Sequence, residues 1–176
     1  LYVTAPYSDL VNYTFEEIQD FASHGLFLYN TLERVKELPE EFQSYVTLCG
    51  ENEVISGCDF LSLHLPLNDE TRNMISAPQL ASMKAGAYVI NAARGGIVNE
   101  KDLYEALVSG HIAGAAMDVS EVEPMAEENP LRTLDNVIIT PHIGMYSKEA
   151  IGAVSLICAQ NVAACAAGAE LKFQVV

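Results

Sequence analysis

The sequence predicts an α/β fold built on a parallel sheet, because three short apolar runs alternate with helical patterns. The runs are 87–93, 113–119 and 136–141. Continuous apolar runs of this length are typical of parallel strands buried on both faces. They carry or lead to Arg94, Asp118 and His142. Because the ligand crevice of an open α/β sheet lies at the carboxyl ends of its strands, we expect these side chains at one edge.

Composition and charge limit the classes of protein and partner. A chain of 176 residues, half of them apolar, predicts one globular domain, with two small lobes as the alternative. The formal net charge of −15 argues against nucleic acid or an anionic membrane surface as a partner. An anionic substrate would therefore need a local cation. With nine lysines and arginines in the chain, Arg94 after a strand is the leading choice.

The cysteines and the N-terminus predict a cytoplasmic protein. The four cysteines have no metal-ligand spacing, so we expect reduced thiols and no metal site. No secretory signal is visible at the N-terminus. The apolar stretch 151–168 is interrupted by Gln160 and Asn161, which favours a packed helix over a membrane span.

The first fifty residues alternate strand and helix patterns. Residues 1–5 and 26–29 read as strands, and Thr14 with Glu17 forms a capping box that opens a helix ending near residue 24. A charged helix over 33–44 and a short strand over 45–49 would follow. This β-α-β-α-β order suits an α/β fold.

From Cys58 onward the expected elements are strands at 60–65, 87–93, 113–119 and 136–140, and helices at 77–84, 99–109 and 147–168. Asn99 is a good N-cap for the second of these helices, which Ser109 and Gly110 would end. The small residues 113–116 would allow another backbone or a ligand to approach the third strand. Residues 121–132 read as an acidic loop.

Three motifs carry a resemblance to a known family. The sets A-A-R-G-G (92–96), A-M-D-V-x-E-x-E-P (116–124) and T-P-H-I-G (140–144) resemble the cofactor domain of the D-isomer-specific 2-hydroxyacid dehydrogenases. The resemblance extends from about Cys58 to Val176. It implies a Rossmann-like doubly wound parallel sheet that binds NAD, with NADP as an alternative. It also implies an oxidoreductase that transfers a hydride between NAD(H) and a small D-2-hydroxy or 2-oxo acid.

The same resemblance implies roles for individual residues. Arg94 would hold the substrate carboxylate in two-point contact, and His142 would exchange the proton. Glu123, if hydrogen-bonded to His142, would orient the ring and favour its charged form. The implied cofactor-binding residues are Leu65, Pro66, Ala92, Ala93, Arg94, Asp118, His142, Ile143 and Gly144. His64 is expected to be a polar residue at a strand end rather than a catalytic one.

The N-terminal part departs from this pattern. A dinucleotide fold needs a glycine-rich turn after its first strand, yet the first glycine of the chain is Gly25. Residues 1–46 are then either a degenerate first half of the cofactor fold or a remnant of the family's flavodoxin-like substrate domain. Residues 47–176 would be the rear part of the NAD-binding domain.

Two rival functions follow from that departure. One is a non-catalytic, corepressor-like relative that acts through protein contacts, and the other is an incomplete chain of the same family. The apolar helix over 147–168 and the family pattern indicate a homodimer. NADH binding and turnover of a 2-oxo acid would separate the three hypotheses.

Overall fold

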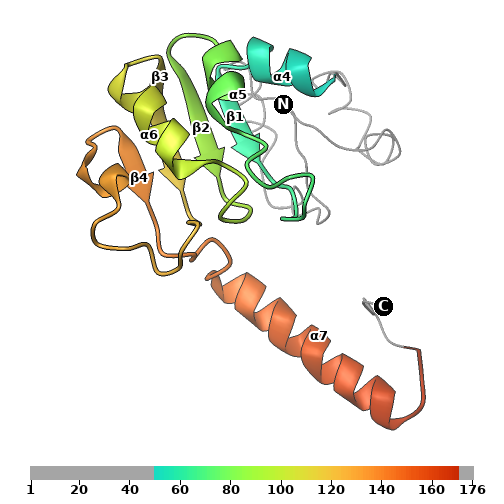
Figure 1. Ribbon diagram of the computed structural model, residues 1–176. Helices are drawn as coiled ribbons and strands as arrows, with labels where there is room; N and C mark the ends of the chain where they lie inside the picture. The colour runs from blue at the N-terminus through green and yellow to red at the C-terminus, as the bar shows by residue number, and fades with distance from the viewer. Residues whose placement is uncertain (1–49, 171–176) are drawn as a thin grey trace, which may run out of the picture. The chain divides into compact units, whose positions relative to one another are not determined.

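The computed structural model describes residues 50–170 (Figure 1). The chain divides into two compact units, Leu1–Pro141 and His142–Val176. The described elements of the first unit are α4 (Glu51–Gly57), β1 (Phe60–Leu63), α5 (Ala77–Ser82), β2 (Ala87–Asn91), α6 (Glu100–Val108), β3 (Ile112–Met117), the 3-10 turn η2 (Pro130–Thr133) and β4 (Val137–Ile139). The second unit holds α7 (Lys148–Ala166). The elements predicted for residues 1–49 lie outside the described residues.

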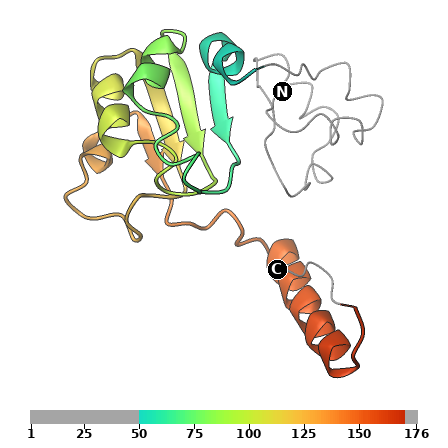
Figure 2. The same ribbon diagram turned by 45° about the vertical axis from the view of Figure 1, so that its right-hand side comes forward.

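The sheet of the first unit has four parallel strands in the order β1-β2-β3-β4 (Figure 2). Strands that follow one another in the sequence are therefore neighbours in the sheet. In register, Ser62 lies opposite Ile90, Ile90 opposite Ala116, and Ala116 opposite Ile138. The predicted parallel α/β sheet is confirmed, and its strand ends meet at one edge.

One face of the sheet carries the hydrophobic core. Alternate strand residues pack against the apolar side chains of α4, α5 and α6, as the period of two in a strand requires. The core members from the strands include Leu61, Leu63, Val89, Ala115 and Met117, and those from the helices include Val54, Ile55, Leu80, Leu103 and Leu107. Leu103 is fully buried, so α6 is held firmly on the sheet.

The opposite face is partly open in the described part of the chain. Phe60 stacks on Tyr88 with ring centroids 5.1 Å apart. Tyr88 nevertheless keeps 42% of its surface exposed, and Ile138 keeps 68%. Burial on both faces is therefore not observed among the described residues, because the helices between Glu51 and Val108 contribute their apolar residues to the other face.

The element boundaries follow local hydrogen bonding. Asn99 caps α6 as predicted, since its side chain accepts a hydrogen bond from the Asp102 backbone N–H at 3.0 Å. β1 ends at Leu63 rather than at residue 65, and α5 ends at Ser82 rather than at residue 84. Helix α4 was not anticipated from the sequence, because its seven residues are too few to establish a helical period.

Helix α7 is long and apolar. Ser147 caps it by accepting a hydrogen bond from the Ala150 backbone N–H at 3.0 Å. No residue of α7 is buried within the described part of the chain, so the predicted packed state is not observed there. Between residues 50 and 170 it is the one helix that by length and composition could cross a membrane, with a mean hydropathy of 1.4.

Candidate active site

The carboxyl ends of β1, β2 and β3 bring most of the predicted site residues to one edge of the sheet in the first unit. Leu65 and Pro66 follow β1, Ala92, Ala93 and Arg94 follow β2, and Asp118 follows β3. Pro66 and Ala92 are exposed, whereas Leu65 and Asp118 are half-buried.

Asn91, the last residue of β2, organises the turn that carries Arg94. Its buried side chain accepts a hydrogen bond from the Ala93 backbone N–H at 3.1 Å and donates one to the Arg94 carbonyl at 3.0 Å. Its own carbonyl accepts a hydrogen bond from the Asp118 backbone N–H at 2.9 Å. The Asn91 side chain therefore closes the Ala92–Arg94 turn, and the Asn91 backbone links that turn to the end of β3. The sequence signal was a polar residue within an apolar run.

Gly95 lets this turn touch the loop that follows β3. A Cβ built on Gly95 would lie 1.8 Å from the Ser120 carbonyl oxygen and 2.9 Å from the Glu121 nitrogen. The adjacent Gly96 has a φ of +81°, which a side chain would strain. Glycine is therefore required at these two positions for different reasons. Gly95 allows a close backbone contact, and Gly96 allows a left-handed conformation.

Asp118 is held by Thr140, the residue that follows β4. The Thr140 hydroxyl donates a hydrogen bond of 2.5 Å to Asp118 Oδ1, and the Thr140 backbone N–H donates to the Met117 carbonyl at 2.9 Å. The carboxylate of Asp118 is thereby tied to the residue that follows β4.

Arg94 and Glu123 lie on exposed loops of the first unit. Arg94 Nη1 donates a hydrogen bond to the Ala93 carbonyl at 2.6 Å. This bond ties the guanidinium to the backbone of its own turn. Glu123 Oε1 accepts one from the Ser120 backbone N–H at 3.3 Å, and the Ser120 hydroxyl donates to the Val122 carbonyl at 2.8 Å. Ser120 therefore contacts both the Arg94 turn and the carboxylate of Glu123.

The stretch after β1 is also fixed by side chains. Ser62 Oγ and His64 Nε2 are 2.8 Å apart, and burial lowers the pKa of His64. The Thr71 hydroxyl donates a hydrogen bond to the Pro66 carbonyl at 2.7 Å. A neutral imidazole at this strand end suits the predicted structural role of His64, beside the backbone expected to face the cofactor.

His142, Ile143 and Gly144 begin the second unit. All three are exposed, and His142 has a φ of 54°. The Ile143 carbonyl accepts a hydrogen bond from the Tyr146 backbone N–H at 2.8 Å, which makes a turn just before α7. His142 therefore stands in a loop immediately after the strand-end residue Thr140 and Pro141.

The amino-acid sequence matches a known family over most of the chain. Residues 18–144 match the model of the D-isomer specific 2-hydroxyacid dehydrogenase, NAD binding domain. The chain belongs to this family of dehydrogenases. The resemblance predicted from the three motifs is thereby confirmed.

Individual relatives agree with this assignment. The chain is 50% identical over 111 residues to D-3-phosphoglycerate dehydrogenase of Methanocaldococcus jannaschii, covering 63% of the chain and 21% of the relative. It is 42% identical over 127 residues to hydroxypyruvate reductase of Thermotoga maritima, covering 71% of the chain and 40% of the relative. The crystal structure of D-lactate dehydrogenase with NAD+ from Lactobacillus jensenii superposes with a TM-score of 0.70 at 32% identity, covering 79% of this chain and 46% of that one. The chain thus spans about a fifth of the length of the phosphoglycerate dehydrogenase and two fifths of the length of the hydroxypyruvate reductase.

The described residues fit the part of a dinucleotide that would lie over the strand ends. The exposed Pro66 follows β1, the exposed Ala92 follows β2, and a hydrogen-bonded carboxylate, Asp118, follows β3. The segment that lacks glycine, residues 6–24, lies outside the described residues. Sequence reasoning missed three residues that shape this edge, Asn91, Glu100 and Thr140, because only the fold reveals their contacts.

Proposed function

We propose that this chain acts as an NAD-dependent D-2-hydroxyacid dehydrogenase that interconverts small 2-hydroxy and 2-oxo acids. The observation that carries the proposal is the linked edge of the sheet, where Asn91 and Gly95 join the Arg94 turn to the loop of Glu123. NADP remains an alternative to NAD. When bound, the reduced cofactor supplies the hydride.

In this proposal Arg94 binds the substrate carboxylate. A guanidinium presents a planar pair of donors that matches a carboxylate in two-point contact. The chain carries a net charge of −15, so an anionic substrate depends on such a local cation. Removing Arg94 should therefore raise KM for the acid and also lower kcat, because a substrate that is not held in place is misaligned for proton exchange with His142.

His142 then gives a proton to the substrate oxygen during reduction and takes it back during oxidation. An imidazole is suited to this exchange near neutral pH. Glu123 would accept a hydrogen bond from the ring and orient it. Ala92, Ala93, Leu65, Pro66, Asp118, Ile143 and Gly144 would line the cofactor.

Turnover measured with variants tests the proposal. NADH oxidation is followed by absorbance with glyoxylate, hydroxypyruvate and pyruvate as substrates. We expect Arg94→Ala and His142→Gln each to lower kcat/KM about a hundredfold or more. Arg132→Ala is the matched control, since Arg132 is exposed on η2 and its guanidinium donates a hydrogen bond to the Met125 carbonyl at 3.3 Å.

The outcomes separate the three hypotheses. Turnover that the two variants abolish supports the dehydrogenase. NADH binding without turnover favours the non-catalytic relative. Absence of both binding and turnover favours the incomplete chain and contradicts the proposal.

We further propose a cytoplasmic homodimer without nucleic acid or membrane partners. The support is the exposed apolar surface of α7, which includes Ile151, Val154, Leu156 and Val162. Such a surface on a soluble protein is normally covered by another protein surface. Light scattering after size exclusion should give twice the chain mass. A monomer, or recovery in a membrane fraction, would contradict this.

A further inference from the structure

Glu100, the first residue of α6, makes contacts that the proposed reaction does not account for. Its Oε1 accepts a hydrogen bond from the Glu121 backbone N–H at 2.6 Å, and its Oε2 accepts one from the Asn129 side chain at 2.6 Å. Glu121 Oε1 in turn accepts one from the Glu100 backbone N–H at 3.1 Å. The carboxylate of each of these two glutamates therefore accepts a hydrogen bond from the backbone N–H of the other. The Glu100 side chain also joins the acidic loop at two points, Glu121 and Asn129.

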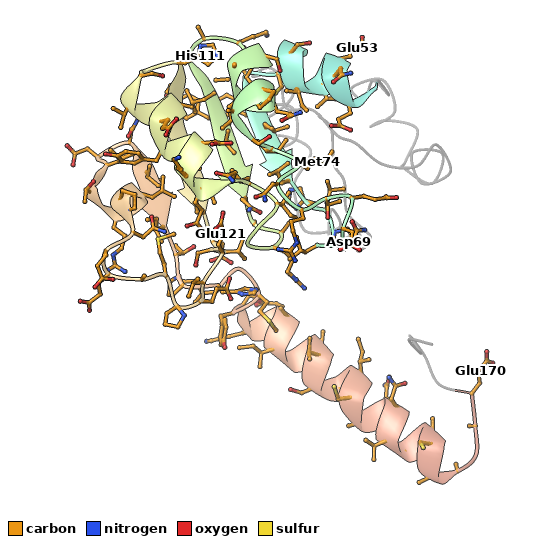
Figure 3. The ribbon with its side chains drawn as sticks, in the orientation of Figure 1. Glu53, Asp69, Met74, His111, Glu121 and Glu170 are labelled. Carbon is orange, nitrogen blue, oxygen red and sulfur yellow. The ribbon has the colours of Figure 1, made fainter. Side chains whose placement is uncertain are left out.

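The loop held in this way carries Glu123. It leaves β3 at Asp118 and reaches η2 at Pro130, and Glu121 within it lies beyond the carboxyl ends of the strands (Figure 3). Hydrogen bonds to an ionised acceptor are shorter and stronger than neutral ones, and both contacts of Glu100 are of this kind. The loop carries several negative charges, and their mutual repulsion would otherwise favour more extended conformations of the loop.

The same contacts relate the loop to Arg94. Gly95 packs on the Ser120 carbonyl, and five residues later Glu100 binds Glu121. The two ends of the segment 95–100 are therefore attached to successive residues of one loop. This closed ring of contacts lies entirely within the first unit, and it fixes where the loop of Glu123 runs relative to the turn of Arg94.

We propose that Glu100 is a positioning residue that holds the Glu123 loop for catalysis. The inference rests on the proposed function, because it assigns Glu100 an effect through Glu123. Glu100 itself makes no contact with substrate in this account. The effect should appear in kcat, with KM for the acid little changed, because Arg94 keeps its own support from Asn91.

A double-mutant cycle tests the proposal. We expect Glu100→Ala to lower kcat about tenfold, to change KM less than twofold, and to speed exchange of the Glu121 amide hydrogen at least tenfold. Glu100→Gln keeps an acceptor for Glu121, so its kcat should remain within threefold of wild type. In a Glu123→Gln background, Glu100→Ala should lower kcat no further, because residues that act through one group are not additive. Glu105→Gln is the control, since Glu105 lies on the exposed side of α6 with only a 4.0 Å ion pair to Lys101.

Each other result overturns the proposal. A full tenfold loss that persists in the Glu123→Gln background would make Glu100 a general structural residue. Faster Glu121 amide exchange with unchanged kcat in Glu100→Ala would show that Glu100 holds the loop without any effect on catalysis. The proposed function would survive that result. Wild-type kcat in Glu123→Gln would remove the role of Glu123 and this inference, and the proposed function would survive. No turnover by the unmodified chain would remove the proposed function and this inference together.

Discussion

Replacing Gly95 with alanine should damage the fold at the point where the Arg94 turn touches the loop after β3. The added Cβ would lie 1.8 Å from the Ser120 carbonyl oxygen and 2.3 Å from its carbon. Real Cβ atoms essentially never approach closer than 3.0 Å, so the two backbones would have to separate by 1.2 Å (3.0 − 1.8) at this contact. Both sides are backbone, and neither can yield by a side-chain rotation.

The size of the loss follows from the kind of atoms that collide. Overpacking a well-packed region costs typically 1–3 kcal/mol, and a backbone collision belongs at the upper end, so we expect a loss of about 3 kcal/mol in the free energy of unfolding. Gly110→Ala is the matched control. Gly110 has a φ of +75° with nothing within 4 Å of an added Cβ, so only the left-handed strain of about 1 kcal/mol applies.

Urea unfolding followed by far-UV circular dichroism measures the difference. With a slope m of about 2 kcal/mol/M, the midpoint should fall by about 1.5 M in Gly95→Ala and by about 0.5 M in Gly110→Ala. Equal midpoints for the two variants would refute the backbone contact. A changed slope would mean that the substitution altered the compactness of one of the states.

Three further predictions concern a cap, a thiol and a histidine. Asn99→Ala should lower the free energy of unfolding by about 1 kcal/mol in the same assay, through loss of the α6 cap, and an unchanged midpoint would contradict the cap. Burial raises the pKa of Cys58 to about 11, so iodoacetamide at pH 8, read by peptide mass spectrometry, should label it about a hundredfold more slowly than the exposed Cys158. Burial lowers the pKa of His64 below 6.5, so the unfolded chain binds the proton first, and the urea midpoint should fall as the pH drops from 7.5 to 5.5. His64→Gln should show a smaller fall, and an equal fall would contradict the burial of this ring.

The sequence was sufficient to predict the parallel sheet and the positions of its strands along the chain. Apolar runs that alternate with capped helices predict parallel strands, and the observed β2, β3 and β4 lie within the predicted ranges or one residue from them. Strand ends were less predictable. The ladder of β2 stops at Asn91, where the side chain begins to bond the turn, although the apolar run continues to residue 93.

The supports of the site could not be predicted, because they depend on contacts between distant segments. Thr140 bonds Asp118 across 22 positions of the sequence, and Glu100 bonds Glu121 across 21. A carboxylate in an acidic chain gives no local signal of such a contact. The identities of Arg94, Glu123 and His142 came from their motifs, and their roles remain proposals.

The central claim is that Arg94 and His142 serve one catalytic centre, and a double-mutant cycle on kcat/KM for 2-oxo acid reduction tests it most directly. Residues that act as a unit are strongly non-additive, so Arg94→Ala combined with His142→Gln should be no more than about tenfold worse than the poorer single variant. Losses that multiply in full, or single variants with wild-type kcat/KM, would contradict the claim.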